Sequence, residues 1–147
     1  MSDDSLDPQD ETEHAGLDPI LFLLGEWVGR GVSHGEPVQG RVVVRPLMDG
    51  SWLEATEIWI NDSGIAIHTD VSFYRFDSQN DCIEVIQLSE QAHRIIRTVE
   101  LQPQGFRWIT GPGSPQLRFW SMDMGFRYAV TMPGDDAPVV EMAYERS

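Results

Sequence analysis

The sequence predicts an all-β protein: an antiparallel up-and-down β-barrel of about ten strands with a short N-terminal helix. Two observations carry this prediction. After residue 25 the chain reads as about ten short segments with β-type periodicity, and clusters rich in Gly, Pro, Asn and Asp separate them. Short links imply antiparallel neighbours. An open meander would leave two edges that invite aggregation, so closure is favoured over an open sheet, and a two-sheet sandwich is the competing architecture.

The elements are expected in the following order. A helix begins at Asp18 or Pro19 and runs to about Leu24, with Asp18 as its N-cap, Pro19 in its first turn and Gly25 at its end. The strands are expected near residues 26–34, 40–46, 51–60, 65–75, 82–89, 93–101, 105–110, 117–122, 126–132 and 138–146. A barrel of this strand number is wide enough to enclose a ligand cavity.

The length of 147 residues fits a single domain. Residues 1–15 are polar, acidic and free of aromatic side chains, which predicts a disordered acidic tail ahead of one β-barrel domain at 16–147. The chain shows neither a secretory signal pattern nor an apolar run of the roughly 18 residues that a membrane span needs. A single cysteine, Cys82, excludes an intramolecular disulfide framework. A cytoplasmic protein is expected.

The charge balance restricts the partners. The formal net charge is −14, which repels phosphate backbones, so neither nucleic acid nor an anionic membrane is an expected partner. All 10 basic residues are arginine. Without lysine the chain has no Schiff-base chemistry and no Walker-type phosphate loop.

A tryptophan stands at the mouth of the first expected strand, in Leu24-Gly25-Glu26-Trp27-Val28-Gly29-Arg30-Gly31. This motif resembles the lipocalin and fatty-acid-binding-protein (calycin) superfamily. With its alternating glycines it is most similar to nitrobindin-like and related lipocalin-like bacterial proteins. Residues 49–54 and 143–146 fit the same groups, and the likeness covers about residues 17–146. In such barrels the first-strand tryptophan packs beneath an arginine of the last strand, which implies a barrel-closing cation–π pair of Trp27 and Arg146.

The resemblance also implies an internal cavity, which in nitrobindins holds haem through a histidine late in the chain. The corresponding stretch here, residues 137–143, contains no histidine. Haem iron needs a strong axial donor. The expectation is therefore a barrel without a cofactor, and haem is the disfavoured alternative.

Few side chains carry a chemical signal. His68 and Asp70 share one face of their expected strand, but zinc needs three or four ligands, so no metal site is expected. One strand earlier, Trp52, Glu54 and Thr56 share a face, and Glu57 lies on the opposite one with Trp59. A carboxylate facing a cavity could orient a polar ligand or act as a general base. The favoured interpretation is that these glutamates face solvent.

Fatty-acid-binding barrels hold a ligand carboxylate with inward arginines and a tyrosine. That resemblance implies Arg107 or Arg127 with Tyr128 or Tyr144, although the adjacent Arg127 and Tyr128 cannot share a strand face. A guanidinium suits a carboxylate in a dry cavity. The candidate ligand-binding residues are Trp52, Glu54, Thr56, His68, Arg107, Arg127 and Tyr128, and no catalytic residue is assigned because no nucleophile elbow of the Gly-x-Ser-x-Gly type exists.

Three functions remain open. The leading hypothesis is a non-enzymatic barrel that holds an apolar or amphipathic small molecule in its interior. The second is a nitrobindin-like haem protein acting on reactive nitrogen species, and the third is an interaction module whose barrel is filled by its own side chains. In Phe119-Trp120 consecutive rings must point to opposite faces, so the aromatic residues either line a cavity or form an outer patch for a homodimer.

Overall fold

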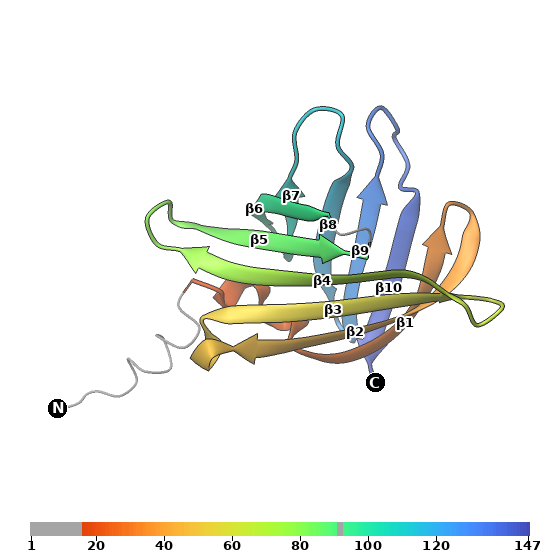
Figure 1. The fold of residues 1–147 in the computed structure, drawn as a ribbon, viewed down its shortest axis with the longest axis horizontal. Helices are drawn as coiled ribbons and strands as arrows, with labels where there is room; N and C mark the ends of the chain where they lie inside the picture. Colours follow the sequence, from red (N-terminus) through yellow and green to blue (C-terminus); the bar gives the residue numbers. More distant parts are fainter. Residues whose placement is uncertain (1–15, 91–92) are drawn as a thin grey trace.

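A computed structural model of the protein describes residues 16–90 and 93–147 and shows a closed barrel of ten antiparallel strands (Figure 1). The predicted fold class is confirmed. The predicted acidic tail at residues 1–15 lies outside the described residues. The strands are β1 (Gly25–Ser33), β2 (Glu36–Leu47), β3 (Trp52–Asn61), β4 (Ala66–Asp77), β5 (Cys82–Ser89), β6 (Arg94–Gln102), β7 (Gly105–Ile109), β8 (Gln116–Met122), β9 (Gly125–Thr131) and β10 (Val140–Arg146).

Each strand pairs with its neighbour in the chain, and β1 also pairs with β10, which closes the sheet. The closing register places Trp27 opposite Arg146 and Gly29 opposite Tyr144. Closure leaves neither of the two unpaired edges that an open meander would expose. The alternatives of an open sheet and a two-sheet sandwich are thereby excluded.

The predicted helix is a short 3₁₀ helix, η1 (Asp18–Leu23), which begins at Asp18 as predicted but has a different N-cap. Leu17 is the N-cap, and Asp18 lies within the first turn without capping a backbone amide. Burial decides which residue is the N-cap, because the fully buried Leu17 and Ile20 anchor the turn in the core. A second 3₁₀ turn, η2 (Met48–Gly50), connects β2 to β3. In the described residues no helix has the length and apolar character needed to cross a membrane.

Trp27 closes the end of the barrel beside η1. Its side chain is 3% exposed, its Nε1 donates a hydrogen bond to the Leu23 carbonyl over 2.8 Å, and its ring meets that of Phe126 edge-on at 5.0 Å. The Arg146 guanidinium carbon lies 4.1 Å from the Trp27 ring centroid, and Nη1 of Arg146 donates to the Leu24 carbonyl over 2.6 Å. The predicted contact between Trp27 and Arg146 is therefore present.

Two inward-facing glycines make room for one tyrosine. In register, Tyr144, Gly29, Gly40 and Trp59 follow one another across β10, β1, β2 and β3. A Cβ on Gly29 would collide with the Tyr144 ring and the Ala143 carbonyl, and one on Gly40 would collide with the Tyr144 hydroxyl. The Tyr144 side chain therefore lies across both glycines and reaches the inner face of β3.

Candidate functional site

The barrel interior is not packed solid but contains a cavity of about 340 Å³. Leu23 lines it on the side of η1. At the other end of the barrel its lining includes His34 of the β1–β2 turn and Thr110, Ser114 and Pro115 between β7 and β8. The wall between is mainly aliphatic and aromatic, with lining residues such as Val42, Val44, Trp108, Leu117, Phe119, Phe126 and Tyr128. The cavity therefore offers an apolar environment that opens at one end of the barrel.

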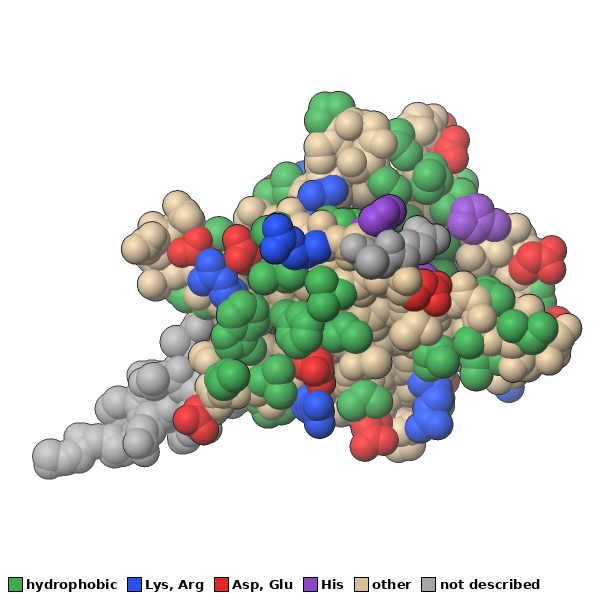
Figure 2. All heavy atoms as spheres, in the orientation of Figure 1, with side chains coloured by type: hydrophobic (Ala, Val, Ile, Leu, Met, Phe, Trp, Pro, Cys, Tyr) green, Lys and Arg blue, Asp and Glu red, His purple; other side chains and the backbone are tan. Residues whose placement is uncertain are grey.

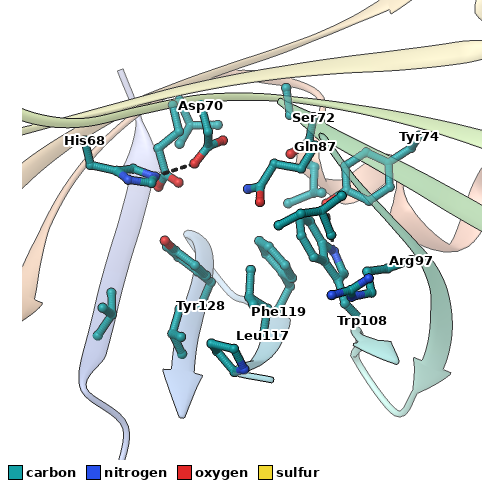
Figure 3. Close-up of a pocket in the computed structure, with 18 of the residues that line it drawn as sticks. His68, Asp70, Ser72, Tyr74, Gln87, Arg97, Trp108, Leu117, Phe119 and Tyr128 are labelled. Carbon is teal, nitrogen blue, oxygen red and sulfur yellow. Dashed lines mark hydrogen bonds and ion pairs between the residues drawn. The ribbon is translucent and has the colours of Figure 1, made fainter. Parts of the chain in front are cut away.

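Three ionisable side chains meet on one wall of this cavity. Glu57 comes from β3, and His68 and Asp70 come from β4; Glu57 and Asp70 are direct cross-strand partners. Each residue offers one ligand atom, and these atoms all lie within 4.8 Å of one another. His68 Nε2 is hydrogen-bonded to Asp70 Oδ2 (Figure 3). These three residues are called the Glu57–His68–Asp70 cluster below.

Burial sets the protonation of this cluster. Burial, followed by the charge of Asp70, raises the pKa of Glu57 to about 7, although the hydrogen bond from Tyr144 and the nearby indole N–H of Trp59 act in the opposite direction. For His68, burial alone would lower the pKa, but the hydrogen bond and charge of Asp70 outweigh it, so the pKa is raised. Near neutral pH Glu57 is therefore close to the midpoint of its titration, and the raised pKa of His68 favours its protonated form.

Two tyrosines face the Glu57 carboxyl. The Tyr144 hydroxyl donates to Oε2 of Glu57 over 2.6 Å. Burial and the charge of Glu57 hold the pKa of Tyr144 and of Tyr128 well above the ordinary value. Both hydroxyls are therefore neutral donors at physiological pH.

The remaining wall is built from stacked rings. Phe119 lies between Phe106, at 4.7 Å, and Tyr128, at 5.1 Å, with both pairs of rings nearly parallel. Trp108 Nε1 donates to the Tyr74 hydroxyl over 3.2 Å. Figure 3 shows Trp108 and Arg97 across the cavity from His68 and Asp70. A molecule that filled the cavity would touch rings on one side and the cluster on the other.

Among the described residues, Trp59 is the one tryptophan whose buried indole nitrogen lacks a hydrogen-bond partner. Its side chain is 5% exposed and lines the cavity, and its ring centroid lies 4.3 Å from that of the His68 imidazole, with the two planes tilted by 32°. Nε1 lies beside Glu57 and Tyr144 but completes a hydrogen bond with neither. A buried donor left in this state costs about 1–3 kcal/mol, which an acceptor in the cavity would recover.

The structure brings His68 and Tyr128 together in the cavity, whereas Trp52, Glu54 and Thr56 lie on the outer face of β3. The inward residues of this strand are the alternate ones, including Ala55, Glu57 and Trp59. The outward residues have surface partners instead: Glu54 accepts from Arg45 over 2.7 Å, and Trp52 lies under Arg75.

Arg107 and Arg127 also lie outside the barrel. Arg107 pairs with Glu100, and Arg127 is exposed on the strand position next to the buried Tyr128. The arginine that lines the cavity is Arg97. The face of the molecule shown in Figure 2 mixes hydrophobic, basic and acidic side chains.

Glu57 is the residue that sequence reasoning missed, and the prediction that it faces solvent is wrong. Alternation along the strand gives Glu57 and Trp59 a common face, and a tryptophan is more often buried than a glutamate. That pairing is the signal that could have placed Glu57 inside. Phe119 and Trp120 point to opposite faces as expected, with Phe119 inward and Trp120 beneath the outward Arg118.

The cluster predicts that stability falls as pH rises. The folded pKa of Glu57 is about 7 against 4.5 in the unfolded chain, so the folded state holds the proton more tightly between these values. The groups facing Glu57 are Asp70 and His68 on β4, Tyr128 on β9 and Tyr144 on β10; the raised pKa of His68 acts in the same direction. We expect the free energy of unfolding to drop by roughly 2–3 kcal/mol between pH 4.5 and 8 on account of Glu57.

Urea unfolding across this pH range measures the effect. Glu57→Gln should flatten the pH dependence, while Glu54→Gln on the outer face of the same strand should retain the wild-type profile. Identical profiles for wild type and Glu57→Gln would show that Glu57 does not titrate between pH 4.5 and 8.

No protein-family model matches this chain, and no curated protein matches its sequence.

Proposed function

We propose that the protein binds an amphipathic small molecule inside the barrel. The apolar part packs against the aromatic wall, and the polar group faces the Glu57–His68–Asp70 cluster. The observation that carries this proposal is a cavity of about 340 Å³ with rings on one side and three ionisable groups on the other. Small-molecule sites typically combine an apolar cavity of about 300–1,000 Å³ with a few convergent polar groups.

The unpartnered Trp59 indole supports a ligand that carries a hydrogen-bond acceptor. Buried polar groups are normally paired, and a donor aimed into a cavity is paired when a ligand or water accepts from it. Tyr128 adds a neutral hydroxyl beside Glu57. A carbonyl, ether or hydroxyl oxygen would suit these donors.

The cavity also weighs against an interaction module with a filled barrel, because such a module would need no open interior. The closed antiparallel barrel is consistent with a calycin-like fold. Kinship to nitrobindin-like proteins stays part of the proposal, resting on Leu24-Gly25-Glu26-Trp27-Val28-Gly29-Arg30-Gly31.

The residues present do not fit haem. Strand β10 contributes Val140, Met142 and Tyr144 to the buried face, and Tyr144 already donates to Glu57. No step of the proposed function involves haem.

Binding of the neutral amphipathic dye Prodan tests the proposal. The dye has a flat ring system and one carbonyl acceptor, and its emission shifts to the blue when it leaves water. We expect a saturable blue shift with one dye per protein. Ala55→Phe, which fills the cavity from β3, should weaken dye binding at least tenfold.

Thr56→Phe is the matched control, because it adds the same ring to the outer face of the same strand. It should leave dye affinity unchanged, and circular dichroism should show folded protein for both variants. The proposal fails if folded Ala55→Phe binds the dye as tightly as Thr56→Phe. Native mass spectrometry of gently purified protein would identify a ligand that co-purifies.

A further inference from the structure

We propose that the Glu57–His68–Asp70 cluster binds a divalent transition-metal ion such as Zn²⁺. The cluster supplies one imidazole and two carboxylates, and its ligand atoms all lie within 4.8 Å of one another. Zinc takes histidine and carboxylate ligands at about 2.0–2.2 Å. Small side-chain rotations bring three atoms at this spacing around one ion. This inference is independent of the proposed binding of an organic ligand.

The backbone explains why the three ligands converge. Glu57 and Asp70 are direct cross-strand partners on β3 and β4, and His68 lies two residues before Asp70 on the same face. All three project from paired strands and not from loops; Glu57 and Asp70 lie within the ladder, and His68 is the third residue of β4, opposite Trp59. Sites on such rigid elements hold ligand geometry more precisely than loop sites.

The local charge favours a cation. Asp70 is 7% exposed, and Glu57 faces it across the strand pair. Among the described residues that line the cavity, Arg97 is the one arginine, and it lies across the cavity from the cluster (Figure 3). Two facing carboxylates in an apolar cavity require a proton or a cation between them. A divalent ion neutralises both at once.

An independent observation comes from Trp59. Its indole nitrogen is buried, has no partner, and lies beside Glu57 and Tyr144 at the edge of the cluster. The three protein ligands leave coordination positions free on the side of the cavity. An oxygen bound there, from water or from a ligand, is the acceptor that the indole N–H lacks.

The donor set selects the class of metal. Imidazole suits zinc, copper, iron and nickel, whereas sites for calcium and magnesium are built from oxygen alone. The cavity side of the cluster is open, which resembles the three-ligand arrangement of catalytic zinc sites more than a closed structural site. Ca²⁺ should therefore bind far more weakly than Zn²⁺.

Calorimetric titration of tag-free, metal-free protein with Zn²⁺ at pH 7.5 tests the inference. We expect one ion bound at high affinity, and at least tenfold weaker binding in Glu57→Gln and in Asp70→Asn. Glu54→Gln, on the outer face of β3, should retain wild-type affinity. His34→Ala should retain it as well, because His34 lies outside the cluster at the cavity mouth.

Co²⁺ gives a second readout, since its visible absorption reports coordination by nitrogen and oxygen and is lost in the cluster variants. Thermal unfolding without metal separates loss of ligand from loss of fold. The inference is overturned if Zn²⁺ binds folded Glu57→Gln and Asp70→Asn as tightly as Glu54→Gln, or if wild type binds none. Prodan binding is measured on metal-free protein, so neither outcome of the Zn²⁺ titration changes it. Failure of the metal proposal can therefore be distinguished from failure of the proposed function.

Discussion

Trp27→Ala is expected to lower the free energy of unfolding by about 3–5 kcal/mol, the range for deleting a large buried aromatic side chain. The ring is 3% exposed and contacts Phe126, and Arg146 lies over its face. The substitution also removes the hydrogen bond to the Leu23 carbonyl, which fixes η1 against the barrel. Urea unfolding followed by circular dichroism measures the loss.

Trp120→Ala provides the comparison. Trp120 is half-buried on the outer face beneath Arg118, so its removal should cost about 1 kcal/mol or less. Arg146→Met removes the cation above the Trp27 ring but leaves the indole in place. The stability lost in this variant therefore separates the cation–π contact from burial of the indole. Equal losses for the two tryptophans would show that the end of the barrel beside η1 does not depend on Trp27.

Gly29→Val is expected to cost about 3 kcal/mol or more, at or above the upper end of the usual range for overpacking. The new Cβ would collide with the Ala143 carbonyl and with the Tyr144 ring. Neither can move away freely, because Ala143 belongs to the β1–β10 pairing and Tyr144 is 2% exposed. The midpoint of thermal or urea unfolding reports the change.

Gly111→Ala is the matched control for this glycine. A Cβ at Gly111 meets nothing within 4 Å, and its φ is not in the left-handed region. Alanine there should leave the free energy of unfolding within about 1 kcal/mol of wild type. Because alanine restricts the unfolded chain more than glycine does, a small gain in stability is favoured. If Gly29→Val were as stable as Gly111→Ala, the pairing of β1 with β10 would tolerate a side chain at a position where the structure leaves no room for one.

The barrel could be predicted because its signals are local. Turn residues and β-type segments depend only on neighbours in the sequence, and they located ten strands to within a few residues. The N-cap of η1 could not be read in this way. Asp18 is a good capping residue by its own chemistry, but the burial of Leu17 and Ile20 depends on the closed barrel around them.

The candidate site escaped prediction for a similar reason. His68 and Asp70 could be recognised as a pair from their spacing, but the third member, Glu57, joins them only through the register of β3 against β4. A one-residue slip in that register would turn Glu57 to the surface. Which face of β3 points inward is decided by packing. Trp59 on the face of Glu57 favours that face, but Trp52 on the opposite face favours the other one, so the local sequence gives two competing signals.

The hydrogen bond between Tyr144 and Glu57 joins residues 87 positions apart in the chain. It exists only when β10 has paired with β1, so the cluster gains its last partner at the step that closes the barrel. Contacts of this sequence separation form slowly during folding. When a ligand or metal ion occupies the cluster, hydrogen exchange should therefore slow at the amides that pair β1 with β10, far from the bound molecule. The exchange rate at this pairing would then report whether the cluster is occupied.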